Sequence, residues 1–141
     1  MIIRGKIVYV YDIEVFQNIF HCSVKNTETN DIYKFEISER KNQLRDLVKF
    51  FKQVDKYITW GDYYTTNINI PANVIFCGYN NLHYDNPIIN YIIEYEDKLM
   101  QYNIPTICSS IFNLSKTITT SSEDNIDAWK HWKYQIWFDT F

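Results

Sequence analysis

Two acidic side chains stand two residues apart in the run Tyr11-Asp12-Ile13-Glu14. The residues from Lys6 to Glu14 are mostly β-branched and aromatic, a composition that favours a central strand. Because alternate residues of a strand point to opposite faces, the two carboxylates should leave the same face near the end of the strand. Carboxylates this close repel each other unless one has a raised pKa, joins a salt bridge or shares a bound divalent cation.

A third acid, Asp85, is expected at the start of a helix. It follows a short apolar strand predicted over Val74–Tyr79, and it precedes Asn86-Pro87, a cap and a proline typical of a first helical turn. The helix dipole there would favour the ionised carboxylate that a metal ion requires. A lone Asp-x-Glu at a strand end is more often a solvated edge, so the acids carry weight only in combination.

Together these acids suit one kind of chemistry. Hydrolysis of a phosphodiester needs hydroxide at neutral pH and stabilisation of charge on the attacking and leaving oxygens. Two divalent cations about 3.5–4 Å apart supply both, and hard oxygen ligands suit Mg²⁺ or Mn²⁺. Asp12, Glu14 and Asp85 are therefore the candidate metal ligands and catalytic residues.

Hydrophobic periodicity predicts the elements that position these acids. The polar run Lys25–Asn30 between two apolar runs predicts a hairpin turn, and apolar residues at helical spacing follow it. Five strands are expected, over Lys6–Glu14, Ile19–Val24, Ile32–Ile37, Val74–Tyr79 and Tyr134–Asp139. Two helices are expected over about Asn42–Tyr57 and Asn86–Gln101, and irregular chain is expected over Thr59–Pro71 and Ile104–Asn125.

The order of these elements indicates an α/β fold. Three consecutive strands favour an antiparallel meander, and the strand–helix–strand connection that follows favours parallel pairing. The expected architecture is a mixed sheet flanked by helices, in a single domain over residues 1–141.

Composition limits the classes of function. The formal net charge is −3, which disfavours a protein that holds nucleic acid by its own charge alone but allows an acidic enzyme that reaches phosphate through cations. Cys22, Cys77 and Cys108 form no Cys-x-x-Cys pair, so a zinc site is not expected. The first residues do not resemble a signal peptide, and no apolar run has the length of a membrane span. A soluble, cytoplasmic protein is expected.

Three runs, in this order, carry a family resemblance. Tyr11-Asp12-Ile13-Glu14 resembles the first exonuclease motif of the DEDD (DnaQ-like) superfamily, and Gly78-Tyr79-Asn80-Asn81-Leu82-His83-Tyr84-Asp85 resembles the second. Trp137-Phe138-Asp139-Thr140-Phe141 is similar to the strand ending in Asp-Ser/Thr that follows the second motif. The chain thus resembles the N-terminal part of the 3′–5′ proofreading exonuclease domain of phage family-B DNA polymerases. The resemblance implies a ribonuclease-H-like fold and, for a phage protein, location in the host cytoplasm.

The resemblance also implies roles for individual residues. Asp12 would ligate both of two Mg²⁺ or Mn²⁺ ions, Glu14 would hold the ion that activates water, and Asp85 would support the second ion. Asn81 and Tyr84 would contact the sugar and base at the 3′ end of single-stranded DNA, although a core position is the alternative for Tyr84.

The sequence departs from the family pattern at the fourth acid. That acid stands on a late helix as Tyr-x-x-x-Asp or His-x-x-x-x-Asp, and neither spacing occurs after Asp85. The domain is therefore expected to be C-terminally incomplete and to lack its last helices, with remaining polymerase domains or a second chain as partners that would complete it. Hydrolysis by this chain alone is expected to be weak or absent. The alternatives are a non-catalytic homologue that binds DNA or a protein, and a related nuclease that acts on RNA or as an endonuclease.

Overall fold

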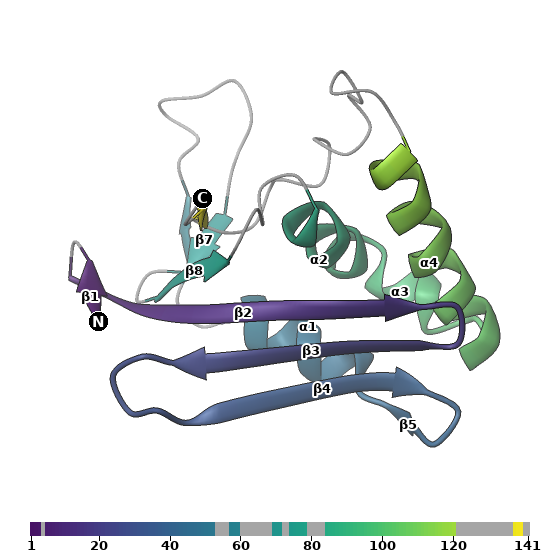
Figure 1. Cartoon of the computed structure of the whole chain (residues 1–141), viewed down its shortest axis with the longest axis horizontal. Helices are drawn as coiled ribbons and strands as arrows, with labels where there is room; N and C mark the ends of the chain where they lie inside the picture. Colours follow the sequence, from purple (N-terminus) through teal and green to yellow (C-terminus); the bar gives the residue numbers. More distant parts are fainter. Residues whose placement is uncertain are drawn as a thin grey trace.

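The computed structural model describes residues 1–3, 5–52, 57–59, 69–71, 74–78, 84–120 and 137–139; for residues 3, 57–59, 69–71 and 137–139 only the backbone is described. Its longest feature is an antiparallel meander of β2 (Lys6–Phe16), β3 (Ile19–Asn26) and β4 (Ile32–Ser38) (Figure 1). Two short strands extend it, because β1 (Ile2–Ile3) pairs with β2 and β5 (Lys41–Asn42) pairs with β4.

On the other side of β2 the pairing becomes parallel. β8 (Val74–Gly78) runs parallel to β2, and β9 (Trp137–Asp139) runs parallel to β8. The resulting order is β5-β4-β3-β2-β8-β9, so β2 has an antiparallel neighbour on one side and a parallel one on the other. The expected α/β fold, with an antiparallel meander, parallel strands and flanking helices, is confirmed at this level.

The described residues form four helices. They are α1 (Leu44–Lys52), α2 (Asp85–Glu94), α3 (Glu96–Leu99) and α4 (Ile104–Thr120). Helix α1 lies behind the meander in the view of Figure 1, and α4 contacts β2, β3 and β4 of the meander. None of the helices in the described part of the chain has the length and apolar content needed to cross a bilayer.

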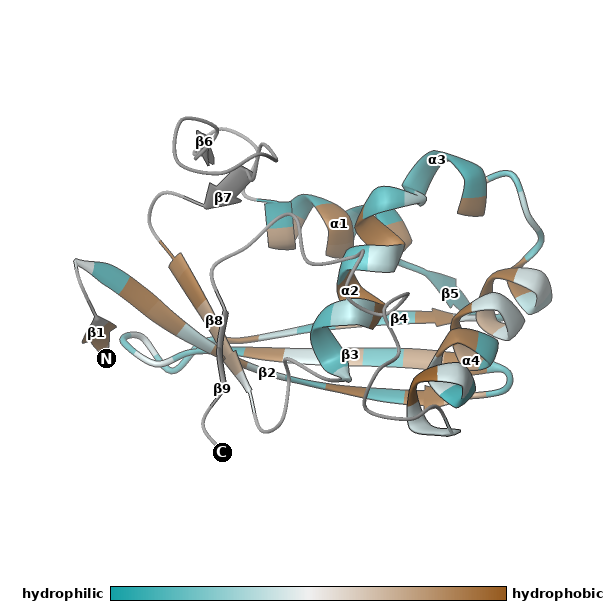
Figure 2. Ribbon diagram, turned by 90° about the horizontal axis from the view of Figure 1, so that it is seen from above, coloured by the Kyte–Doolittle hydropathy of each residue, from teal (hydrophilic) through white to brown (hydrophobic). Residues whose placement is uncertain are grey.

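The core lies between the sheet and the helices. The rings of Phe51 on α1 and Phe76 on β8 stack with centroids 4.6 Å apart, and Tyr11 of β2 meets Phe51 edge to face at 5.5 Å. Hydrophobic stretches of α1, α4 and β8 are brown in Figure 2. Complete burial of such aromatic and aliphatic side chains is the main stabilising contribution to a domain of this size.

The expectation of an irregular Ile104–Asn125 was wrong over Ile104–Thr120, which forms α4. Ile107, Cys108 and Ile111 are buried at helical spacing and join the core. The many Ser and Thr residues suggested a loop, yet their hydroxyls bond backbone carbonyls one turn earlier, as Ser110 does with Thr106 at 2.9 Å. Residues 121–125 lie outside the described part of the chain.

Other boundaries also differ from expectation. A helix was expected over about Asn42–Tyr57, and the structure has α1 over Leu44–Lys52. Tyr57 instead begins strand β6 (Tyr57–Thr59). β6 pairs with β7 (Asn69–Pro71), so both ends of the expected loop Thr59–Pro71 are strands. The helix expected over Asn86–Gln101 is divided at Tyr95 into α2 and α3.

Candidate functional site

Asp12 and Glu14 lie on β2 as the alternation predicted. Both side chains are exposed, whereas their neighbours Tyr11 and Ile13 are buried at 2% and 6% exposure. The parallel pairing with β8 ends at Val10, so the two acids come directly after it. The ends of parallel strands are where open sheets form ligand crevices, which makes this part of β2 a suitable place for a site.

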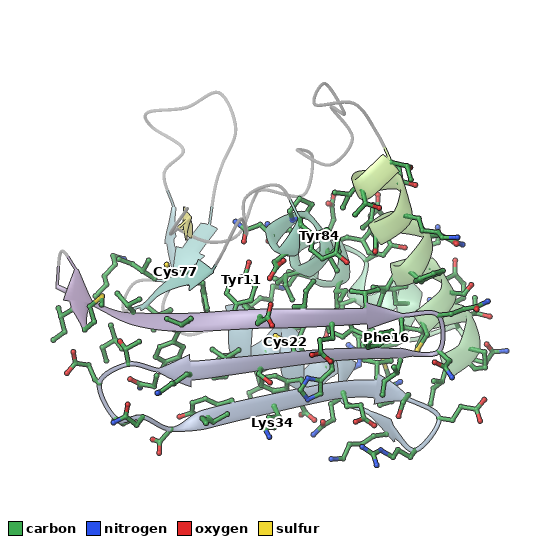
Figure 3. All side chains as sticks on the ribbon, in the orientation of Figure 1. Tyr11, Phe16, Cys22, Lys34, Cys77 and Tyr84 are labelled. Carbon is green, nitrogen blue, oxygen red and sulfur yellow. The ribbon has the colours of Figure 1, made fainter. Side chains whose placement is uncertain are left out.

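Asp85 is the first residue of α2 and is 6% exposed. The next residue, Asn86, accepts a hydrogen bond through Oδ1 from the hydroxyl of Tyr11, the residue before Asp12. Tyr11 extends from β2 toward α2 (Figure 3). This bond anchors the N-terminus of α2 to β2 next to the acidic pair, although Tyr11 itself leaves the face of β2 opposite to Asp12.

The acids of β2 and α2 act electrostatically on one buried group. Burial, followed by the negative charges of Asp85 and then Asp12, holds the pKa of the Cys22 thiol well above its ordinary value. Cys22 is fully buried on β3, opposite Ile13. Both carboxylates therefore lie within electrostatic reach of the same point in the core, where a low dielectric strengthens such interactions.

The described residues do not bring the three acids into one metal-binding group. Within the parts of the chain given above, no three His, Cys, Asp or Glu side chains lie close enough together to hold a metal ion. The structure pairs Asp12 with Glu14 on one face of β2 and leaves Asp85 buried at the start of α2. The donor chemistry still fits Mg²⁺ or Mn²⁺, because exposed carboxylates are hard oxygen ligands.

Tyr84 and Asn81 are the residues expected to contact DNA. Tyr84 precedes α2, is half-buried, packs against the core and has its hydroxyl 3.0 Å from the hydroxyl of Ser115 on α4. Asn81 lies outside the described residues. The backbone of Asp139 pairs with Gly78, which sets its strand beside the one that leads toward the second motif.

The residues that face the acidic pair across β3 were not predicted from the sequence. Asp12 faces Ser23 on β3, and Glu14 faces His21. The hairpin register follows from Phe16 pairing with Ile19 across a two-residue turn, Gln17-Asn18. The register was not predicted, because the first strand was expected to end at Glu14. A two-residue turn at Gln17-Asn18 would have fixed it.

A third carboxylate on the same face is already engaged. Glu36 on β4 faces His21 and accepts hydrogen bonds from the Arg40 guanidinium at 2.7 and 2.8 Å and from the Ser38 hydroxyl at 2.6 Å. Arg40, then Ser38, lowers the pKa of Glu36 to about 2. The Arg40 guanidinium therefore compensates the charge of Glu36, whereas neither Asp12 nor Glu14 forms an ion pair with another described residue.

No protein-family model, curated protein or solved structure matches this chain.

Proposed function

We propose that this chain carries the metal-binding strand of a 3′–5′ exonuclease of the ribonuclease-H-like class, acting on single-stranded DNA with Mg²⁺ or Mn²⁺. The observation that carries the proposal is the exposed pair Asp12 and Glu14 on one face of β2, directly after its parallel pairing with β8. A divalent cation would stabilise such a pair, and it could supply the hydroxide and the charge stabilisation that phosphodiester hydrolysis needs.

The arrangement of the sheet supports the proposed fold. An antiparallel meander followed by a strand that returns parallel to the first is the plan expected of a ribonuclease-H-like domain, and β2, β3, β4 and β8 follow that order. Helix α2 is the next described element after β8 in the sequence, and its first turn is bonded to Tyr11 beside Asp12. The two motifs of the family resemblance thus belong to elements that are in contact.

Each residue would have a distinct part in the reaction. Asp12 and Glu14 would hold the cation directly, and Asp85, buried at the start of α2, would support a second cation through water. When bound, the cations would generate hydroxide and stabilise charge on the scissile phosphate. Asp85 is the first residue of α2, a position at which the helix dipole favours negative charge.

Mn²⁺ binding measured by electron paramagnetic resonance tests the proposal. The double variant Asp12→Asn/Glu14→Gln is expected to lose at least tenfold in Mn²⁺ affinity. The matched control is Glu39→Gln/Asp46→Asn, which removes the same charge from exposed positions away from β2 and should bind Mn²⁺ like the wild type. Equal Mn²⁺ affinity in both variants would contradict the proposal.

The reaction itself is tested with 5′-labelled single-stranded DNA and excess protein. Slow shortening from the 3′ end is expected in Mn²⁺, and it should disappear in the Asp12→Asn/Glu14→Gln variant. Parallel assays on RNA and on closed circular DNA separate this activity from a ribonuclease or an endonuclease. Mn²⁺-dependent binding of DNA with no cleavage would instead identify a non-catalytic homologue.

A further inference from the structure

The face of the meander that carries Asp12 and Glu14 has a defined grid of side chains. Residues paired across antiparallel strands point to the same face and lie about 5 Å apart at Cβ. The strand register therefore sets three rows running from β2 through β3 to β4. The rows are Val10–Lys25–Ile32, Asp12–Ser23–Lys34 and Glu14–His21–Glu36, and they are called the open face below.

Positive charge on the open face lies on β3 and β4. Lys25 and Lys34 are both exposed, and neither forms an ion pair with another residue of the described chain. Glu36, the acid nearest to them on β4, is neutralised by Arg40. The charges of the two lysines are therefore available to an anionic ligand. The acids on β2 would repel such a ligand unless a bound metal ion offsets their charge.

Apolar side chains are exposed on the same face. Val10 is 43% exposed and Ile32 is 60% exposed, at the two ends of the row that contains Lys25. Phe16, two residues beyond Glu14 on β2, is 54% exposed (Figure 3). Cations interspersed with an exposed ring and aliphatic groups suit a ligand that combines phosphates with bases and sugars.

We propose that the open face is the path of the DNA single strand leading to its 3′ end, with Lys34 and Lys25 contacting phosphates upstream of the one held at Asp12 and Glu14. The inference rests on the proposed function, because that function sets the position of the 3′ end. Charge complementarity favours DNA as the occupant. Its anionic backbone would meet the lysine side chains on β3 and β4, and it would meet bound metal ions at the acids of β2. Lys34 lies in the row of Asp12, two strands away, so a strand crossing the sheet would pass over Ser23 between them.

The test is the salt dependence of binding to a fluorescent oligothymidylate, measured by anisotropy in Ca²⁺ with the full chain. Each phosphate contact contributes about 0.7 to the slope of log K against log salt for single strands. The variant Lys25→Gln/Lys34→Gln should therefore lower the magnitude of that slope by about 1.4. The control Lys49→Gln/Lys98→Gln removes exposed lysines from α1 and α3 and should keep the wild-type slope.

Two further measurements separate the inference from the proposed function. Mn²⁺ affinity should be the same in Lys25→Gln/Lys34→Gln as in the wild type, because the acids of β2 are retained. Intact Mn²⁺ binding with an unchanged salt slope would overturn the DNA path and leave the exonuclease proposal standing. Mn²⁺ affinity that is unchanged in the Asp12→Asn/Glu14→Gln variant would overturn the exonuclease proposal. An acidic peptide that competes as well as DNA of equal charge would overturn the assignment of DNA as the occupant.

Discussion

Asn90 is a buried polar residue of α2. Its side chain is fully buried on α2, and within the described part of the chain neither its amide nitrogen nor its oxygen has a hydrogen-bond partner. Burying a polar group without a partner costs about 1–3 kcal/mol. Such a group is uncommon in a core, so Asn90 is a position where stability is lost.

Replacing Asn90 with Leu is therefore expected to stabilise the chain. The change removes the cost of desolvating the carboxamide and keeps a side chain of similar size, so the free energy of unfolding should rise by about 1–2 kcal/mol in urea titrations. Asn90→Ala serves as the control for lost volume and should give a smaller gain or a loss. A marked destabilisation by Leu would mean that the carboxamide holds an ordered water.

At the scale of elements, the carboxylate of Glu36 stabilises the β4–β5 hairpin. Glu36 binds both Arg40 and Ser38, and Arg40 is the larger reason that the pKa of Glu36 falls from 4.5 to about 2. A depressed carboxyl pKa stabilises the folded state at pH values above the unfolded pKa. That stabilisation is lost as pH falls through the folded pKa. The hairpin should therefore weaken in acid.

The expected result is a pH-dependent effect of Glu36→Gln. The variant should be less stable than the wild type at pH 6–7, and the difference should shrink as pH falls from about 4.5 and vanish near the folded pKa of about 2. Thermal unfolding across this pH range measures the difference. Glu39→Gln changes the net charge equally nearby and serves as the control. A deficit for Glu36→Gln that is constant down to pH 2 would contradict the role of the ion pair.

The largest mismatch between pattern and element was α4. Apolar spacing was present in Ile107, Cys108 and Ile111, but the Ser and Thr residues between them obscured it. Such hydroxyls favour turns when they compete for the backbone, yet here they bond carbonyls within the helix. Packing of α4 against β2, β3 and β4 overrides the weak propensity.

At the scale of the whole molecule, one buried bond joins the two halves of the candidate site. Tyr11 on β2 donates to Asn86 on α2 across 75 residues of sequence. Asp12 directly follows Tyr11, and Asp85 directly precedes Asn86. The bond belongs to a core that also contains Phe51 and Phe76. Its loss should loosen α2 relative to the sheet.

Tyr11→Phe tests this connection. The variant leaves the ring in place and deletes the donor to a buried amide oxygen, so the free energy of unfolding should fall by about 1–3 kcal/mol. Chemical denaturation measures the change. Tyr33→Phe removes a hydroxyl from a half-buried ring that packs on Phe50, and it should change stability by no more than about 0.5 kcal/mol. Equal effects of the two changes would show that the Tyr11 bond is unimportant.

The alternation of acidic and buried residues on β2, the meander and the apolar face of α1 were all predictable, because each depends on the period of side chains within one element. The convergence of Asp12, Glu14 and Asp85 on a cation stays a prediction. Convergence depends on contacts between segments far apart in the sequence, and no local pattern specifies those contacts.

By itself the sequence determined which residues could do chemistry and which elements would carry them. Only the tertiary structure decided that Glu14 faces His21, that Asp12 lies in a row with Lys34, and that Tyr11 binds the first turn of α2. The physical reason is that hairpin register and helix docking are chosen by hydrogen bonds and packing between elements. Those interactions are satisfied together only when the whole chain has folded.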